Sequence, residues 1–286
     1  MKVMLNESIS KHTTIRIGGD AKIYLIPQNL EELISCIVEH RGYKIISGGS
    51  NILANDNAVF ECVIDMHDCC REFYQIEDNQ FYIGASLPIQ KVIRELQAYN
   101  RGGFEFLYSL PALFGGTVTM NAGRGADKRT ISDYIKSVRF LDNKGYIQEF
   151  DKSECCFSNR HSVFQDKDYI VLGAVIECDY VDSKESKARV QERITFSRTH
   201  HDLRFPNCGS IFSYSNARIM SSIRLYSKAF KLIKRNNGLI FSDRCNNWII
   251  NLGHGTYSEA IRLIAFTERV HRMLNKRIER EIVIWE

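Results

Sequence analysis

Proline is scarce in this sequence, with four residues among 286, so glycine, asparagine and aspartate must form most of the turns. No run approaches the roughly 18 consecutive apolar residues of a membrane helix, and the first ten residues lack the apolar centre of a signal peptide. Repeats and low-complexity segments are missing from the sequence as well. We therefore expect a cytoplasmic protein with no membrane partner.

The cysteines lack any CxxC spacing, although there are nine of them. Without that spacing a zinc site has no support, and we expect no metal ion. Two pairs are adjacent in the sequence, Cys69–Cys70 and Cys155–Cys156. In a reducing compartment an odd number of cysteines is most simply a set of free thiols, several of them buried.

A strong charge of one sign is also missing. The formal net charge is +4 and the basic residues are scattered, which argues against nucleic-acid binding. A mild positive excess would suit an anionic small substrate such as a nucleotide, although net charge alone does not decide this. The 44% hydrophobic and 25% charged residues are typical of a soluble globular protein. A chain of 286 residues suggests two domains, and we place the boundary in the polar stretch 181–198.

Helices and strands are predicted to alternate in the first half of the chain. Asn29 and Glu32 resemble a capping box at the start of a short helix. Pro88 is suited to the start of a second helix. Strands are predicted over residues 44–46, 61–65 and 80–85, a hairpin over 137–150, and a long β-rich run over 169–180.

The second half ends with an amphipathic helix and a terminal strand. One face of the helix is predicted to carry four apolar residues, Leu263, Phe266, Val270 and Met273. The strand is predicted over residues 278–285, with Glu281, Val283 and Trp285 on one side.

Two glycine-rich segments are candidate ligand sites. Gly48-Gly49-Ser50-Asn51 follows a predicted strand, and its small residues let the backbone approach an anion. Alone, this motif fits a plain tight turn better, because neither the GxGxxG nor the P-loop spacing is present. Residues 110–123 make a poor strand and a poor helix because of their paired glycines. They suit a backbone wrapped round a large flat ligand, and a glycine-rich contact between helices is the alternative.

Three polar residues stand beside distinctive motifs. Taken alone, Arg160 fits a surface or salt-bridge residue, Ser210 a turn hydroxyl, and Glu281 a surface strand charge. In a site, the planar guanidinium of Arg160 could clamp a carboxylate or enolate. No GxSxG elbow surrounds Ser210, so a hydrolase nucleophile has no support.

Taken in order, these segments resemble the UDP-N-acetylenolpyruvoylglucosamine reductase family. One such motif is weak evidence, whereas seven in the same order are strong evidence. The matching stretches cover nearly the whole chain and are residues 13–19, 48–53, 103–123, 159–164, 206–212, 248–251 and 281–284.

The resemblance implies an α+β fold. A two-lobed FAD-binding domain of the vanillyl-alcohol-oxidase type would occupy residues 1–182, and a smaller α+β substrate-binding domain residues 183–286. FAD would be bound non-covalently, NADPH would be the reductant, and we expect a monomer. By position, the FAD pyrophosphate would lie at Gly48, Gly49, Ser50, Asn51 and Ile52, and the flavin would be lined by Pro111, Gly115, Gly116, Asn121, Ala122 and Gly123.

The implied reaction is the NADPH-dependent reduction of the enolpyruvyl ether of UDP-GlcNAc enolpyruvate to UDP-N-acetylmuramate, a peptidoglycan precursor. The cofactor would supply hydride, and the protein would supply placement and charge control. Arg160 would stabilise the negative charge that develops on the substrate. Ser210 would give a proton to C2, and Glu281 would orient or polarise the same group.

The sequence departs from the family pattern at several positions. Asn159 replaces a tyrosine before the arginine, Ser213 replaces a lysine expected to meet the substrate diphosphate, and His201-Asp202 replaces Gln-Pro. Phe114 places a bulky ring in the glycine segment. Two alternatives therefore stay open: a flavin oxidoreductase of the same fold that acts on a different nucleotide sugar, and an FAD-binding protein without catalytic turnover.

Overall fold

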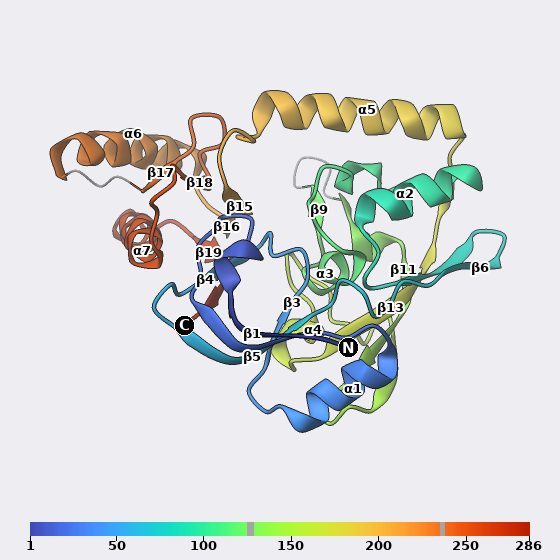
Figure 1. Cartoon of the computed structure of the whole chain (residues 1–286). Helices are drawn as coiled ribbons and strands as arrows, with labels where there is room; N and C mark the ends of the chain where they lie inside the picture. Colours follow the sequence, from blue (N-terminus) through green and yellow to red (C-terminus); the bar gives the residue numbers. More distant parts are fainter. Residues whose placement is uncertain (125–128, 235–237) are drawn as a thin grey trace. The chain divides into compact units, whose positions relative to one another are not determined.

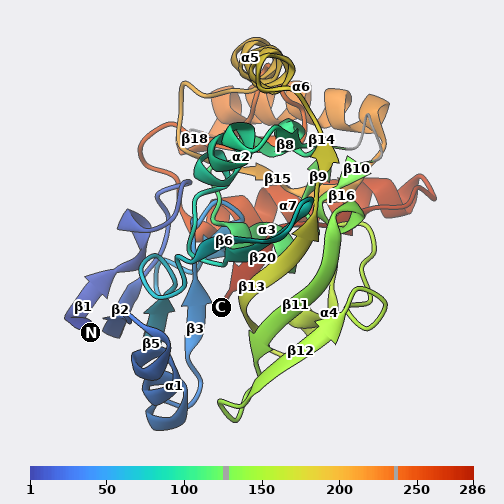
Figure 2. The same cartoon turned by 90° about the vertical axis from the view of Figure 1, so that its right-hand side faces the viewer.

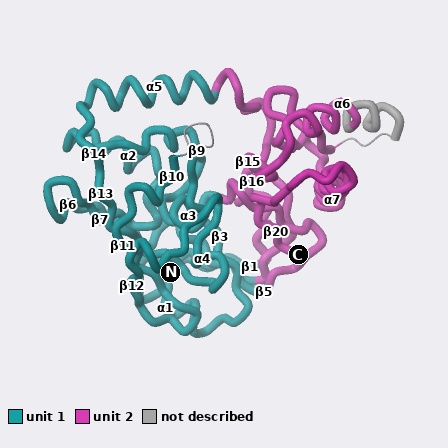
Figure 3. Tube along the Cα trace, turned by 180° about the vertical axis from the view of Figure 1, so that it is seen from behind, with its two compact units in different colours: residues 1–5, 23–48, 61–197 teal, residues 6–22, 49–60, 198–286 magenta. Residues whose placement is uncertain are grey.

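The structure is a computed structural model that describes residues 1–124, 129–234 and 238–286, without the side chains of 124 and 227–234 (Figure 1). The chain forms two compact units (Figure 3). Unit 1 contains residues 1–5, 23–48 and 61–197, and unit 2 contains residues 6–22, 49–60 and 198–286. The chain therefore passes between the units five times. The expected α+β content is confirmed, while the domain boundary at 182/183 stays a prediction about function.

The largest sheet of unit 1 has five antiparallel strands in the order β12-β11-β13-β7-β6 (Figure 2). The predicted hairpin is present, because β11 and β12 pair antiparallel from Ser137 opposite Asp151 to Leu141 opposite Ile147. The strands are β6 (Phe73–Glu77), β7 (Gln80–Gly84), β11 (Ile135–Leu141), β12 (Ile147–Asp151) and β13 (Ile170–Glu177).

A four-stranded sheet has the order β1-β2-β5-β3, and the division between the units falls within three of its strands. Its members are β1 (Lys2–Ser8), β2 (Asp20–Ile26), β3 (Lys44–Ile46) and β5 (Val59–Asp65). Strands β3 and β5 are parallel, with Ile46 opposite Asp65. This register brings the segments that follow the two strands, which begin at Ser47 and Met66, to the same edge.

The two predicted helices of unit 1 are confirmed. Helix α1 (Leu30–Glu39) begins where Asn29 Oδ1 accepts a hydrogen bond from Glu32 N at 2.9 Å. The Glu32 carboxylate accepts from Gln28 N, so only half of the capping box forms. Helix α2 (Ile89–Ala98) follows Pro88 and buries Ile89, Val92, Ile93 and Leu96 on one face. The shorter elements are η2 (Glu105–Leu107), α3 (Phe114–Thr119), η3 (Ile131–Asp133), α4 (Val163–Asp166), β8 (Arg101–Gly102), β9 (Gly123–Arg124), β10 (Arg129–Thr130) and β14 (Asp179–Tyr180).

Unit 2 combines short strand pairs with two long helices. A three-stranded antiparallel sheet has the order β15-β18-β17, and β4 pairs in parallel with β20. Its core joins Ile15, Ile17 and Leu53 to side chains from the last third of the chain. Its elements are η1 (Ile9–Lys11), β4 (Ile52–Ala54), β15 (Asn207–Ser210), β16 (Phe212–Tyr214), α6 (Ala217–Lys234), β17 (Leu239–Phe241), β18 (Trp248–Asn251), α7 (Tyr257–Met273), β19 (Glu279–Arg280) and β20 (Val283–Trp285).

The polar stretch that we predicted as a boundary is a helix, α5 (Ser183–His200). Few apolar residues hold it in place within unit 1. The fully buried Ser186 Oγ donates to Glu105 Oε1 at 2.8 Å and accepts from Gln97 Nε2 at 3.1 Å. The polar stretch is therefore an ordered helix that docks through buried hydrogen bonds as well as apolar area, and the division between the two compact units falls at 197/198, near its end.

The predicted apolar face of α7 is half right, because Leu263 and Val270 pack against the core of unit 2. Phe266 is 36% exposed and Met273 is 76% exposed. The buried stripe instead contains Ala260, Ile264, Thr267 and His271. His271 is suited to the core because Nε2 accepts from Asn216 N at 3.1 Å while Nδ1 donates to the Thr267 carbonyl at 2.9 Å.

The terminal strand is also shorter than predicted. Residues 278–285 form two separate strands, β19 and β20, with Glu281 and Ile282 between them. Ile282 is 5% exposed and Val283 37% exposed, so the expected alternation is broken. Pairing with two different partners explains the break, because β19 pairs with β16 and β20 pairs with β4.

Candidate functional site

The Gly48–Gly49 turn follows β3 and requires two residues without side chains. A Cβ on Gly48 would lie 2.7 Å from the Pro111 carbonyl oxygen. Gly49 has φ +59°, and a Cβ there would lie 1.9 Å from the His12 carbonyl oxygen. Both glycines therefore let the backbone approach a neighbouring loop of the same unit closely.

The turn also presents unpaired backbone donors. Within the part of the chain that the structure describes, the N–H groups of Gly48, Gly49 and Ser50 donate to no protein acceptor. Backbone N–H groups in folded proteins are nearly always paired, with protein, water or ligand. Successive N–H groups in a turn form an anion-binding concavity. This geometry favours the ligand interpretation over a plain turn.

Asn51 and Ile52 connect this turn to the strand after Glu281. Asn51 Nδ2 donates to the Glu281 carbonyl oxygen at 3.0 Å, and Val283 N donates to the Asn51 carbonyl at 3.0 Å. Ile52 opens β4 and lies opposite Val283. One function of Asn51 is therefore to hold the backbone at Glu281, a contact between residues 230 positions apart that sequence spacing does not reveal.

The second glycine segment contains the short helix α3, which corrects our prediction of a poor helix. A Cβ on Gly115 would lie 2.7 Å from the Ala85 Cβ, and one on Gly116 would lie 2.9 Å from Ser47 Oγ. These glycines therefore let the helix pack closely on the residues that follow β7 and β3, which is a contact with strand ends and not the contact between helices of the alternative. Phe114 is 0% exposed and belongs to the core, whereas Pro111 is exposed.

Arg160 lies against the end of this glycine segment in unit 1. Its Nη2 donates to the Gly123 carbonyl at 2.6 Å, and its Nη1 lies 3.5 Å from the Asn121 carbonyl. The buried Asn121 in turn donates through Nδ2 to the Ser158 carbonyl at 2.7 Å. The structure thus brings Asn121, Ala122 and Gly123 together with Arg160, and these carbonyls orient its guanidinium.

Ser210 and Glu281 are brought together at the backbone level in unit 2. Glu281 N donates to the carbonyl of Ile211, the residue after Ser210, at 2.8 Å. Ser210 follows Gly209, which has φ +72° and whose N–H donates to Asn207 Oδ1 at 3.1 Å. Both candidate side chains are half-buried. Gly209 adopts the left-handed backbone conformation that favours glycine, so this turn before the serine needs a glycine.

Sequence reasoning missed Asp202, which anchors the serine segment. Its side chain is 0% exposed and accepts from Arg204 at 2.9 Å and from Ser242 Oγ at 2.8 Å. The Arg204 guanidinium holds the pKa of Asp202 below its ordinary value, against the opposing effect of burial. The Asp202 carbonyl accepts from Asn207 Nδ2 at 3.2 Å. The only sequence signal was its position, where the family carries Gln-Pro.

The state of the cysteines agrees with the expectation of free thiols, several of them buried. All nine cysteines are free, and seven are buried. Among the residues that the structure describes, no helix is long and apolar enough to span a membrane. In that same part of the chain, no cluster of three or more His, Cys, Asp or Glu side chains could hold a metal ion.

Known proteins resemble this chain along nearly its full length. A family model described as an FAD binding domain matches residues 21–151. UDP-N-acetylenolpyruvoylglucosamine reductase from Moorella thermoacetica is 29% identical and covers 100% of this chain and 94% of its own. The enzyme of that name from Caldanaerobacter subterraneus subsp. tengcongensis is 26% identical over 94% of this chain and 88% of its own.

A solved structure shares the fold. The UDP-N-acetylenolpyruvylglucosamine reductase of Thermus caldophilus superimposes with a TM-score of 0.76 at 23% identity, covering 100% of this chain and 98% of its own. With the matching FAD-binding family model, this confirms the predicted α+β fold with an FAD-binding domain of the vanillyl-alcohol-oxidase type. The unpaired N–H groups of Gly48–Ser50 fit the pyrophosphate of FAD.

Proposed function

The resemblance of this chain to the UDP-N-acetylenolpyruvoylglucosamine reductase family is confirmed, and we propose that the chain is itself such a reductase. It would reduce the enolpyruvyl ether of UDP-GlcNAc enolpyruvate with NADPH and supply UDP-N-acetylmuramate for peptidoglycan synthesis. The observation that carries the proposal is the turn at Gly48–Ser50, whose three N–H groups have no acceptor among the described residues and suit a pyrophosphate. Non-covalent FAD, when bound, supplies the hydride.

The proposed roles of the chain's own side chains follow from their chemistry. Arg160 carries a planar, permanently charged fork of donors, and the carbonyls of Asn121 and Gly123 orient it. It would stabilise negative charge on the substrate carboxylate. Ser210, which follows the turn at Gly209, would deliver a proton to C2. Glu281 would orient or polarise the same group.

A different nucleotide sugar is the second candidate, because the chain lacks a family lysine. Ser213 occupies that position, and its Oγ lies 3.5 Å from the Glu279 carbonyl. A cation does lie close to this segment, since the Arg277 guanidinium stacks 4.7 Å from the centre of the Tyr214 ring. Arg277 also pairs with Glu279. Arg277 would hold the substrate diphosphate at a place different from that set by the family lysine. The substrate would then be a different sugar that carries the same anionic group.

The test follows the flavin spectrum through two half-reactions. The purified protein should show flavin absorbance that bleaches with NADPH under anaerobic conditions and recovers when UDP-GlcNAc enolpyruvate is added. Ser210→Ala should slow the recovery by roughly 100-fold or more, as for loss of a general acid, and spare the bleaching. The exposed Ser222→Ala on α6 is the matched control and should change neither step.

Each contrary result has a clear meaning. Bleaching without recovery would reject the named substrate and direct the search to other enolpyruvyl or nucleotide sugars. A protein that never bleaches would support the non-catalytic FAD-binding alternative. A colourless protein that cannot be reconstituted with FAD would overturn the proposal as a whole.

The proposal also covers the location of the enzyme, its oligomeric state and the roles of its two domains. We propose a cytoplasmic monomer whose residues 1–182 serve FAD and residues 183–286 serve the sugar, with no nucleic-acid partner. The mild net charge of +4 supports the last point. Light scattering coupled to size-exclusion chromatography should give the mass of one 33.0 kDa chain, and a larger mass would contradict the monomer.

A further inference from the structure

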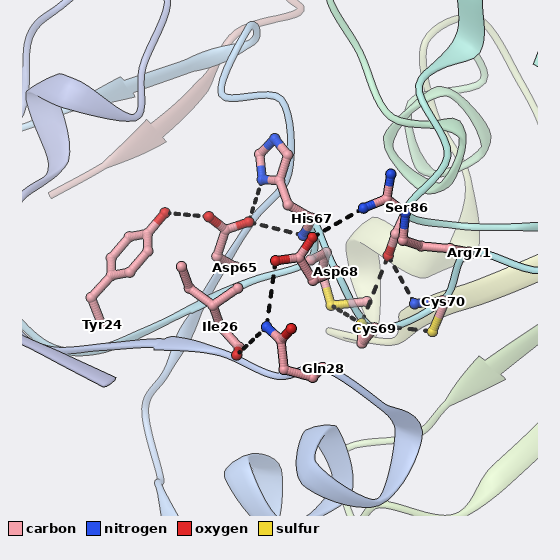
Figure 4. Close-up of polar contacts among 11 residues, drawn as sticks. Tyr24, Ile26, Gln28, Asp65, His67, Asp68, Cys69, Cys70, Arg71 and Ser86 are labelled. Atoms are coloured by element: carbon pink, nitrogen blue, oxygen red, sulfur yellow. Dashed lines mark hydrogen bonds and ion pairs between the residues drawn. The ribbon is translucent and has the colours of Figure 1, made fainter. Parts of the chain in front are cut away.

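The two adjacent cysteine pairs of the chain differ in the direction of their thiols. Cys155 is buried and its Sγ lies 3.4 Å from the Asp151 carbonyl, whereas Cys156 is exposed and its Sγ lies 3.5 Å from the Glu154 carbonyl. The thiols of Cys69 and Cys70 converge instead, with their Sγ atoms 3.7 Å apart (Figure 4). Of these two pairs, Cys69 and Cys70 are therefore the one whose thiols are arranged to react together.

The two converging thiols are buried, with Cys69 7% and Cys70 4% exposed, so an external disulfide reaches the Cys69 sulfur through local opening of this segment. The Cys69 Sγ also lies 3.8 Å from Ser86 Oγ and 3.9 Å from the Met66 sulfur. A hydrogen bond from the Cys70 thiol lowers the pKa of Cys69, and the same bond raises the pKa of Cys70. Cys69 is therefore the sulfur of the pair that ionises first. The thiolate is the nucleophile in disulfide exchange.

We propose that Cys69 and Cys70 form a vicinal dithiol site that a low-molecular-weight disulfide oxidises to an internal disulfide. The Cys69 thiolate attacks one sulfur of the oxidant, forms a mixed disulfide and expels one thiolate. Cys70 then loses its proton, attacks the Cys69 sulfur and expels the second thiolate. The two protein thiols are oxidised by two electrons, the oxidant is reduced to two thiols, and these carry the two protons.

The geometry of neighbouring residues makes this disulfide easy to reduce. Consecutive Cα atoms lie about 3.8 Å apart across a trans peptide. Disulfides usually join Cα atoms about 4.4–6.8 Å apart, and departures from that range strain the bond and make it more reducible. Strained disulfides are the labile, regulatory kind. The disulfide between Cys69 and Cys70 should therefore be reduced by mild thiol treatment.

The pair is also connected to the glycine segment through the backbone. Cys70 N donates to Ser86 Oγ at 3.0 Å, and Ser86 N donates to the Cys70 carbonyl at 2.8 Å. The next residue towards the N-terminus, Ala85, accepts from Gly115 N at 2.9 Å. Formation of the Cys69–Cys70 disulfide changes the backbone at Cys70. The change would therefore reach Gly115 through Ser86 and Ala85. This inference goes beyond the proposed reaction and does not rest on it.

The test is peptide mass spectrometry after oxidation of the whole folded protein. The protein is treated with excess oxidised glutathione, quenched by alkylation of free thiols, and then unfolded, alkylated with a second reagent and digested. The expected product is a peptide with Cys69 and Cys70 joined, lighter by two hydrogen atoms and free of both labels. Brief treatment with dithiothreitol before quenching should restore two labelled thiols at these positions.

The other cysteine pair is the internal control. Cys156 is exposed, so it should carry glutathione or the first label, which shows that the reagents worked. Cys69→Ser should abolish the joined product and leave the reaction at Cys156 unchanged. Two separately labelled thiols at Cys69 and Cys70, found together with modified Cys156, would overturn the proposal.

Discussion

At the scale of single residues, the glycine at position 49 combines two constraints that can be separated. Its φ is +59° and a Cβ would lie 1.9 Å from the His12 carbonyl, whereas Gly42 has φ +72° with nothing within 4 Å. Gly42→Ala should therefore lower the free energy of unfolding only by about 1–2 kcal/mol, the cost of the left-handed conformation. Gly49→Ala should lower it by more and also weaken FAD retention. Urea denaturation and flavin absorbance measure the two effects, and equal losses would contradict the close contact.

The buried carboxylate of Asp202 makes a second prediction at this scale. Asp202→Asn should lower the free energy of unfolding by about 1–3 kcal/mol at neutral pH, because it breaks a charge-assisted pair with the half-exposed Arg204. The pKa of Asp202 is lowered in the folded state by Arg204. Its stabilisation is therefore complete above the unfolded pKa of about 3.9 and is lost as the pH falls through the lower folded value.

Urea denaturation of both proteins over a pH series checks this sign. The difference between wild type and Asp202→Asn should be constant near neutrality and should shrink below about pH 4. A difference that grows on acidification would show that the carboxylate does not have a lowered pKa. Leu203→Ala, at an exposed neighbouring position, is the control and should show no such pH dependence.

Individual site residues were predictable only where a motif carries them. The motifs indicated Gly48, Arg160 and Ser210 because short stretches around them repeat a family pattern. Asp202 and the contact between Asn51 and the Glu281 carbonyl were not predictable, because both depend on partners that are 40 and 230 positions away in the sequence. Long-range polar contacts leave no periodic signal in a single sequence.

At the scale of secondary-structure elements, α5 depends on one buried hydroxyl. Ser186→Ala should lower the free energy of unfolding by about 1–3 kcal/mol, because Glu105 and the Gln97 amide would each lose a buried partner. Ser35→Ala removes an exposed helix serine of the same unit and should change stability by less than about 0.5 kcal/mol. Thermal and urea unfolding compare the two variants. Equal losses would mean that the buried network does not hold α5.

Prediction of elements succeeded where local signals agreed. The Asn29 cap, the Pro88 start and the hairpin over 137–150 each combine a turn or cap residue with a clear period, and all three are present. Prediction failed where buried positions carry polar side chains that form hydrogen bonds with distant residues. Polar side chains occupy buried positions on α5 and α7, at Ser186 and His271 for example, so apolar periodicity did not reveal the helix α5 and gave only half of the buried face of α7.

At the scale of the whole molecule, the interleaved path of the chain makes unit 2 dependent on distant segments. Its core requires Ile15, Ile17 and Leu53 from the first sixty residues. A fragment of residues 198–286 expressed alone should therefore lack cooperative unfolding, whereas the full chain should show it. Circular dichroism during heating distinguishes the two. A fragment that melts cooperatively would show that these three side chains are dispensable.

The same interleaving limits how such a protein can change over evolutionary time. A domain formed by one continuous stretch of chain can be exchanged between genes as a unit. Here the chain crosses between its units five times. Exchange of the C-terminal part alone would therefore separate the two sets of side chains that form the core of unit 2. New specificity must then arise by substitutions within an intact gene. The departures at Asn159, Ser213 and Asp202, scattered among motifs that follow the order of the family, are the kind of change that this architecture permits.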